Sequence, residues 1–249
     1  SEVTDIGDND ILIYAGFTNL GNGARVGYPL GAMFGSRIAR DEDGNLLVDG
    51  VGNYLADQVD EDGVLPFIGD PNPDFVMNYT NTFEYKGLSL GFAINHTSGG
   101  DIYSTTTATL MGRGLTTDTE NRLSTYILPG VNINTGLPND IQINNSNFYF
   151  DNGFASPADE LSVYDGSVVR LREVNVAYSL PSKLLNKTPF GKVTIKASAF
   201  NMWYNAYNTP DGVNFDPNTT GLGAGNGQGF EFLTGPSSKR YGMSVNLSF

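Results

Sequence analysis

The chain has 249 residues, a formal net charge of −13 and no cysteine. Without cysteine it can form neither a disulfide framework nor a thiolate metal site, and no run approaches the roughly eighteen apolar residues that a membrane-spanning helix requires. The first 165 residues hold 23 acidic side chains and six basic ones. This balance repels phosphate backbones and argues against nucleic-acid binding.

Residues 41–74 hold ten acidic residues and no basic one, which is typical of a solvated loop. Within DEDGN, Asp41, Asp43 and Asn45 stand at alternating positions and suggest calcium. However, Gly44 is misplaced for an EF-hand loop and the distal glutamate is missing. A solvated turn is the main interpretation, and a calcium site at Asp41, Asp43 and Asn45 is the alternative.

A β-hairpin is predicted from Phe75 to His96. In FVMNYTNTFEY and again in LSLGFAINH, apolar and polar side chains alternate with the two-residue period of a strand. Lys86 and Gly87 separate the two runs, and a two-residue connection with glycine is typical of a hairpin turn. His96 has no cysteine or second histidine with which to share a metal, so we interpret it as an interfacial or loop-edge residue.

Two further long strands are predicted before the final one. In VVRLREVNVAYSLP the apolar phase changes near Arg172 and Glu173, which predicts a β-bulge that keeps both halves apolar on the same side. KVTIKASAFNMW follows a compact linker, Pro181 to Gly191. The chain closes with KRYGMSVNLSF, whose apolar face carries Tyr241, Met243, Val245, Leu247 and Phe249.

The connections are of two kinds. Residues 86–87 and 181–191 are short, whereas residues 39–73, 98–166 and 204–238 are long and polar, so the long ones should all leave one end of the sheet. Long unstructured connections are uncommon in compact soluble domains, and strands of about 9 to 11 residues match a tilted transmembrane strand. The pattern predicts an all-β, transmembrane antiparallel β-barrel with a polar lumen and long extracellular loops. A secreted β-sandwich is the alternative.

Aromatic residues cluster where the strand ending at Trp203 opens into a long connection. Aromatic rings stack on sugars and pack on peptide side chains, so Tyr204, Tyr207 and Phe215 are predicted to contact a ligand, while Trp203 is interpreted as a membrane-interface anchor.

The glycine-rich residues 221–229 lack phosphate-loop spacing and are interpreted as an external loop. No catalytic motif is present, and paired acids in loops lack a fixed surrounding shell. We therefore predict neither enzymatic activity nor a cofactor.

Several motifs together resemble the C-terminal part of SusC/RagA-type TonB-dependent outer-membrane transporters. They follow the order and spacing of that family along nearly the whole chain. The matching stretches are RVGYPLGAMFG, GDPNPDF, NTFEYKGLSLGF, GGDIY, VVRLREVNVAYSLP, AFNM and the terminal YGMSVNLSF. The chain departs from the family in having Gly235 and Pro236, rather than a Tyr-Pro pair, shortly before the last strand.

The resemblance implies that residues 1–249 are the C-terminal part of a 22-stranded barrel in the bacterial outer membrane, supplying roughly eight strands. The N-terminal plug and the earlier strands would lie outside this chain, consistent with its opening SEVTDIGDND, which has neither an initiator methionine nor signal-peptide features. The implied function is active import of nutrient oligomers, glycans or peptides. The implied partners are a SusD-like surface lipoprotein, TonB acting through the plug, the rest of the transporter and the barrel-assembly machinery. A soluble or surface-exposed β-rich glycan-binding protein is the alternative.

The last residues also resemble the C-terminal assembly signal of outer-membrane barrels. A final strand with an aromatic terminus is expected to pair with the first strand and so to remove an exposed sheet edge. The residues assigned to this signal are Tyr241, Gly242, Val245, Leu247 and Phe249.

Overall fold

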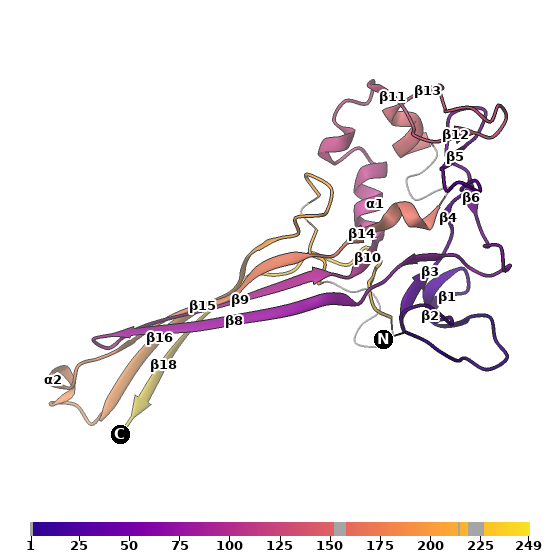
Figure 1. Cartoon of the computed structure of the whole chain (residues 1–249). Helices are drawn as coiled ribbons and strands as arrows, with labels where there is room; N and C mark the ends of the chain where they lie inside the picture. Colours follow the sequence, from indigo (N-terminus) through magenta and orange to yellow (C-terminus); the bar gives the residue numbers. More distant parts are fainter. Residues whose placement is uncertain (1, 152–157, 214, 219–226) are drawn as a thin grey trace. The chain divides into compact units, whose positions relative to one another are not determined.

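The computed structural model describes residues 2–151, 158–213, 215–218 and 227–249. The chain divides into two compact units, each assembled from three separate stretches of sequence (Figure 1). Unit 1 comprises Ser1–Pro73, Gly99–Gly166 and Asn208–Gly235, and unit 2 comprises Asp74–Ser98, Ser167–Tyr207 and Pro236–Phe249.

Unit 2 is built on one sheet of five long strands in the order β18-β16-β15-β9-β8. The pairs β9–β15, β15–β16 and β16–β18 are antiparallel. The resemblance implied roughly eight barrel strands, whereas only five strands in the described residues have nine or more residues. They are β8 (Pro73–Tyr85), β9 (Leu88–Gly99), β15 (Val168–Ser179), β16 (Lys192–Asn205) and β18 (Arg240–Ser248).

The predicted hairpin joins β8 to β9 through Lys86 and Gly87. Both residues have positive φ, 47° and 83°, the backbone conformation of a type I′ turn, which matches the twist of the two strands. A Cβ atom at Gly87 would lie 2.8 Å from the carbonyl oxygen of Ser179. Glycine is therefore required here by both backbone conformation and space, and the hairpin prediction is confirmed.

The predicted bulge lies in β15, where the register with both neighbouring strands shifts between Leu171 and Glu173. Relative to β9, Arg172 is the extra residue, whereas relative to β16 the extra residue lies in β16, between Phe200 and Trp203. Because of the extra residue in β15, Leu171 pairs with Ile94 and Val174 pairs with Phe92, so apolar residues on both sides of the bulge meet apolar residues of β9. The bulge prediction is confirmed. As expected, the bulge keeps the apolar side chains of both halves of β15 on the same side of the sheet.

The short and long connections alternate around this sheet. Short connections join β8 to β9 and β15 to β16, the latter containing the helix α2 (Ser182–Leu185). The stretches of unit 1 precede β8, link β9 to β15 and link β16 to β18. Since neighbouring strands run antiparallel, all three long connections meet the sheet at the same end of its strands, as predicted.

Unit 1 has regular structure of its own, so the prediction of long unstructured connections is wrong. A four-stranded sheet has the order β1-β2-β3-β7, and a three-stranded sheet has the order β14-β10-β17. Within the latter, β10 and β17 run parallel although they are far apart in the sequence. The strands of these two sheets are β1 (Leu12–Phe17), β2 (Leu20–Ala24), β3 (Ala32–Phe34), β7 (Phe67–Gly69), β10 (Asp101–Ser104), β14 (Val163–Asp165) and β17 (Phe230–Glu231).

In the part of unit 1 that the structure describes, three pairs of short strands and four helical segments complete the architecture. The strand pairs are β4 (Arg37–Ile38) with β6 (Ala56–Asp57), β5 (Leu47–Val48) with β12 (Val131–Asn132), and β11 (Thr125–Ile127) with β13 (Gln142–Asn144). The helical segments are α1 (Thr105–Gly112), η1 (Thr117–Thr119), η2 (Asn147–Asp151) and η3 (Asp159–Ser162). Across the residues that the structure places, no helix is long and apolar enough to cross a membrane.

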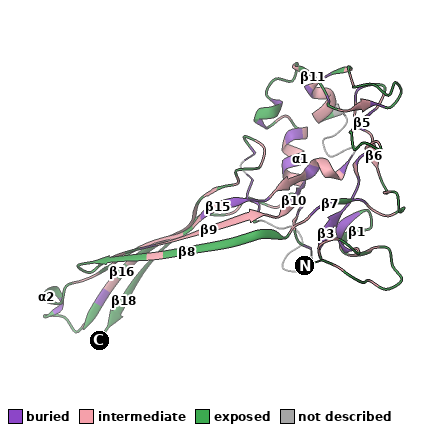
Figure 2. Ribbon diagram, viewed as in Figure 1, coloured by how far each residue is buried: buried purple, intermediate pink, exposed green. Residues whose placement is uncertain are grey.

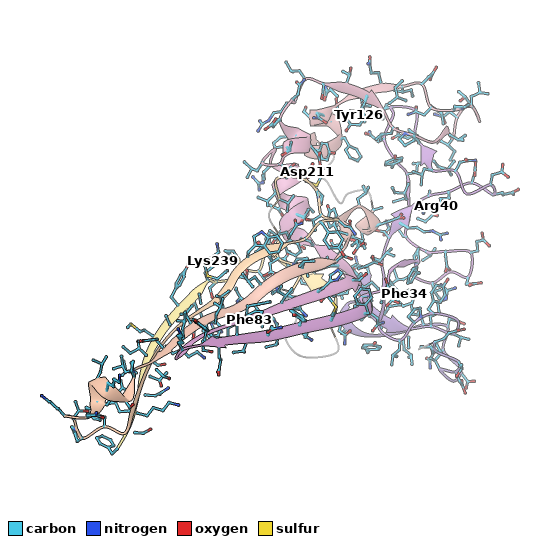
Figure 3. All side chains as sticks on the ribbon, turned by 60° about the vertical axis from the view of Figure 1, so that its left-hand side comes forward. Phe34, Arg40, Phe83, Tyr126, Asp211 and Lys239 are labelled. Carbon is cyan, nitrogen blue, oxygen red and sulfur yellow. The ribbon has the colours of Figure 1, made fainter. Side chains whose placement is uncertain are left out.

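Small apolar clusters hold unit 1 together. One gathers side chains from distant stretches around Val48, Tyr54, Leu128 and Ile143, and another places Phe230 against Met33 and Tyr103. Phe34 and Tyr126, which belong to different parts of the unit, are labelled in Figure 3. These contacts explain why the connecting stretches are folded although their composition is polar.

The charges of the chain separate between the two units. Unit 1 holds 24 acidic and five basic residues, whereas unit 2 holds three acidic and nine basic residues. The acidic excess seen in the sequence is therefore a property of the folded connections. The long sheet is weakly basic.

Gly87→Ala is expected to lower the free energy of unfolding of the intact protein by about 1–2 kcal/mol, the usual cost of holding a non-glycine residue in the left-handed region. Urea unfolding in lipid vesicles measures this change. Gly235→Ala is the matched control, because a Cβ atom there meets nothing within 4 Å. Equal unfolding midpoints for the two variants would contradict the assigned role of the turn.

Candidate membrane-facing and ligand-facing surfaces

One face of the long sheet carries an exposed apolar surface. The register aligns apolar residues across neighbouring strands in rows that run over the sheet. One row contains Leu90, Val176, Ala197 and Met243, the next contains Leu88, Tyr178, Ile195 and Val245, and a third contains Phe92, Val174, Ala199 and Tyr241. Met243 is 77% exposed and Val245 54%. Large apolar side chains are thus exposed in aligned rows on this face.

The opposite face of the sheet is polar. Its rows alternate with the apolar ones and include Ser89, Ala177, Lys196 and Ser244. On this face Lys196 Nζ lies 3.9 Å from Glu173 Oε1, and the hydroxyls of Ser179 and Thr194 are 2.9 Å apart. A sheet with an exposed apolar face and a polar face is suited to separating lipid from water.

The two outer strands of the sheet are open to solvent along their length. β8 is exposed at nearly every position, as its green ribbon shows in Figure 2, and every residue of β18 is exposed. Phe83, labelled in Figure 3, is 58% exposed and lies on β8. Among the residues that the structure describes, neither outer strand has a second partner in this sheet.

Aromatic side chains gather at the end of the sheet where the long connections begin. Leu171 pairs with Ile94 on one side and with Trp203 on the other, so Trp203 lies on the apolar face, where it is 52% exposed. His96 makes an edge-on contact with Phe75, and a ring nitrogen of His96 lies 3.0 Å from the hydroxyl oxygen of Tyr207. The interfacial roles predicted for Trp203 and His96 stay predictions.

The three predicted ligand-contacting aromatics have different surroundings. Tyr207 is 45% exposed and contacts His96, and Tyr204 lies on the polar face with the guanidinium of Arg170 5.7 Å from its ring centre. Phe215 is only 6% exposed and packs with Ile102 and Val213 in a core cluster of unit 1. Burial therefore argues against a stacking role for Phe215. Ligand contact by Tyr204 and Tyr207 stays a prediction.

The DEDGN segment forms a tight turn closed by its own hydrogen bonds. Asp41 Oδ1 accepts hydrogen bonds from the backbone N–H groups of Asp43 and Asn45, and Asn45 Nδ2 also donates to the carboxylate of Asp41. These hydrogen bonds, above all that of the Asn45 side chain, hold the pKa of Asp41 below its usual range. The carboxylate is thus occupied as a turn acceptor, which fits the solvated-turn interpretation. In the described part of the chain, no group of three acidic or histidine side chains is placed to hold a metal ion.

The same turn occurs twice more in this stretch. Asp49 and Asp60 each accept hydrogen bonds from the backbone N–H groups two and four residues later, and a glycine with positive φ follows three residues after each aspartate. The turn at Asp60 is further tied to Arg25 by an ion pair. Asp41, Asp49 and Asp60 therefore shape the backbone of this stretch through their carboxylates. The D-x-x-G spacing was a signal for this that sequence reasoning missed.

The predicted assembly residues all lie at the outer strand β18 or just beyond it. Tyr241, Val245 and Leu247 are on the apolar face, whereas Gly242 pairs with Ser198 on the polar face and has open space where a Cβ would lie. Phe249 is 88% exposed, and its ring lies 5.3 Å from that of Phe190. The geometry leaves these residues accessible, and their role as an assembly signal stays a prediction.

A buried carboxylate, Glu231, anchors the last long connection to helix α1. Its two oxygens accept hydrogen bonds from the hydroxyl of Ser104 (3.0 Å), from the backbone N–H (2.9 Å) and hydroxyl (2.6 Å) of Thr106, and from the backbone N–H and hydroxyl of Thr234. Burial raises the pKa of Glu231, but the hydrogen bonds from Thr106 and Thr234 outweigh it, so the pKa lies below its ordinary value. A carboxylate is also favoured at a helix N-terminus.

No family model matches the chain. The chain is 26% identical over 210 residues to TonB-dependent receptor P3 of Formosa agariphila, covering 84% of this chain and 19% of that protein. It is 25% identical over 196 residues to TonB-dependent receptor P26 of the same organism, covering 73% of this chain and 18% of that protein. The chain thus spans about a fifth of the length of these relatives.

Solved structures with the same fold are those of the RagAB peptide transporter. One superposes with a TM-score of 0.59 at 17% identity, over 100% of this chain and 26% of the other. The RagAB peptide importer in its 'closed-closed' and 'open-open' states gives TM-scores of 0.56 and 0.54. Identities this low show the fold alone.

These relatives define a class, the TonB-dependent receptors and transporters. The resemblance to the SusC/RagA type, first indicated by the sequence motifs, is confirmed by the relatives and the fold together. TonB-dependent receptors are bacterial outer-membrane proteins, so the predicted localisation is confirmed as well. The relatives are named as receptors and transporters rather than as enzymes.

Glu231→Gln is expected to destabilise unit 1 by about 1.5–3 kcal/mol, the usual contribution of hydrogen bonds to a charged group. Because the folded pKa is depressed, this stabilisation is present above the unfolded pKa of the glutamate and is lost as pH falls through the folded pKa. Hydrogen exchange of the α1 amides measures the change. The exposed Glu42→Gln removes the same charge as a control, and equal exchange in both variants would contradict the anchoring role.

Proposed function

We propose that this chain supplies the last strands and external connections of a transmembrane β-barrel that imports nutrient oligomers across the outer membrane. The observation that carries the proposal is the two-faced sheet, with exposed apolar rows on one side and polar rows on the other. A membrane-spanning sheet must also satisfy its edge strands by closure. The open edges at β8 and β18 would then pair with further strands of the same barrel.

The partners follow from the same proposal. TonB supplies energy through a plug domain outside these residues, and a SusD-like surface lipoprotein covers the external side, where the folded connections of unit 1 emerge. Phe249 and the apolar residues of β18 act as the assembly signal read by the barrel-assembly machinery. Peptides and glycans are both candidate cargoes. The peptide transport named for RagAB supports the first, and the exposed Tyr207 suits either.

The barrel is tested by matched lysine substitutions on β18. Val245→Lys places a charge on the apolar face, where lysine costs about 2–4 kcal/mol near the bilayer midplane, and is expected to lower the amount of folded protein in the outer-membrane fraction. Asn246→Lys lies one residue further on the polar face, opposite Thr194, and is expected to be tolerated.

Removal of Phe249 should also lower assembly, whereas Phe190→Ala, which removes only its ring contact, should not.

Two outcomes would overturn the barrel. One is an equal effect of Val245→Lys and Asn246→Lys, because a membrane sheet must distinguish its two faces. The other is extraction of the native protein without detergent, which would instead favour a soluble or surface-exposed glycan-binding protein.

Import is tested by uptake of fluorescent peptide and glycan oligomers into cells. Deletion of the gene is expected to abolish uptake of one of these cargo classes, and inactivation of TonB should have the same effect, because the proposed transport is energised. Measuring both cargo classes in parallel identifies which one is carried. Uptake of both at the normal rate in the deletion strain would refute the proposed function.

A further inference from the structure

Among the described residues, two arginines of unit 1 have no ion-pair partner, unlike the other three. Of the five arginines in this acidic unit, Arg25 pairs with Asp60, Arg37 with Asp57 and Arg40 with Glu160. Arg113 and Arg122 have no acid within ion-pair distance among the described residues. Although unit 1 contains 24 acidic residues, these two guanidinium groups are available to bind an anionic ligand.

The two arginines line the same cavity. It has a volume of about 430 Å³ and lies among the end of α1, η1 and the segment from β13 to η2. Its volume falls within the range of small-molecule sites, roughly 300–1,000 Å³. The residues that matter for recognition are Arg113, Arg122, Leu123, Asn144, Tyr149 and Phe150.

Local backbone structure explains how the guanidinium groups are placed. Arg113 is the C-cap of α1, where a cation is favoured by the helix dipole. Gly114 follows with φ of 72°, and the guanidinium of Arg122 covers it so closely that a Cβ there would lie 2.7 Å from a terminal nitrogen. The absence of a side chain at Gly114 therefore lets Arg122 lie beside the backbone that carries Arg113.

The other walls of the cavity combine apolar and polar groups. Leu123 and Phe150 are 88% and 65% exposed. Asn144 Oδ1 accepts a hydrogen bond from the backbone N–H of Asn147. Burial, and to a smaller extent the charge of Asp118, raises the pKa of the Tyr149 hydroxyl, so Tyr149 stays neutral in the cavity wall.

A second cavity adjoins the first at Asn144. It has a volume of about 320 Å³ and a largely polar wall that includes Asn53, Gln142 and Asn147. Side-chain amides both donate and accept hydrogen bonds, as recognition of a peptide backbone or of sugar hydroxyls requires. Two adjoining cavities of different chemistry suit a ligand of more than one unit.

We propose that this pair of cavities is a binding site for a carboxylate-bearing oligomer. Arg113 and Arg122 hold a carboxylate of the ligand, Leu123 and Phe150 cover its apolar surface, and the amides of the second cavity bind the neighbouring unit. Arginine suits this role because its planar guanidinium forms paired hydrogen bonds with a carboxylate. The proposal rests on the proposed function only in taking the ligand to be an oligomer.

The test measures binding to the purified intact protein in detergent. The probes are a glutamate-rich pentapeptide, its glutamine counterpart, an oligogalacturonate and its methyl ester, so that each acidic probe has a neutral match and the two sources of carboxylate are separated. For one acidic probe, Arg113→Gln and Arg122→Gln are each expected to weaken binding by about tenfold or more, the loss typical for a hydrogen bond to a charged group. Lys239→Gln removes one positive charge from an exposed residue outside unit 1 and should leave binding unchanged.

The outcomes separate this inference from the proposed function. Wild-type affinity of both arginine variants for both acidic probes, or no preference of the wild type for an acidic probe over its neutral match, would overturn the site. An equal loss of affinity in Lys239→Gln would overturn it too, because the effect would then come from overall charge. Each of these results leaves the uptake experiment unaffected, whereas normal uptake in the deletion strain would refute the proposed function and leave the binding result standing.

Discussion

The two-residue alternation of the long strands is the constraint on which the rest of the structure depends. It holds only if every strand stays in phase with its neighbours, since a slip of one residue would move a whole set of apolar side chains to the polar face. The bulge at Arg172 is where the sequence itself breaks phase, and the extra residue restores it in the fold. Because the phase is kept, the apolar rows continue from β9 to β18.

The surrounding architecture follows from this constraint. Strands that must keep one apolar and one polar face cannot carry polar recognition groups at arbitrary positions. Most of the charged groups and ion pairs therefore lie in the connections. Unit 1 accordingly holds most of the acids and the ion pairs formed by Arg25, Arg37 and Arg40, while the long sheet has few acids. The connections are stabilised by small apolar clusters and buried polar contacts instead of one large core.

Local patterns were enough to predict the hairpin at Lys86 and Gly87, the bulge and the two faces of the sheet, because each depends on residues close in sequence. Contacts between distant residues were beyond the same reasoning. Glu231 meets Thr106 across 125 positions, and Phe215 is buried by Ile102, although its neighbours in sequence suggested an exposed aromatic. Arg113 and Arg122 were not selected either, because the lack of an ion-pair partner among the described residues is recognised only once the acids around each arginine have been placed.

The three hydrogen-bonded turns at Asp41, Asp49 and Asp60 have a further consequence. A long polar connection ordinarily loses much conformational entropy when it is fixed against a ligand or a partner protein. Here each aspartate has already restricted its backbone through bonds to the residues two and four positions later. Whatever binds this stretch meets a preorganised surface, so more of the contact energy is retained as affinity.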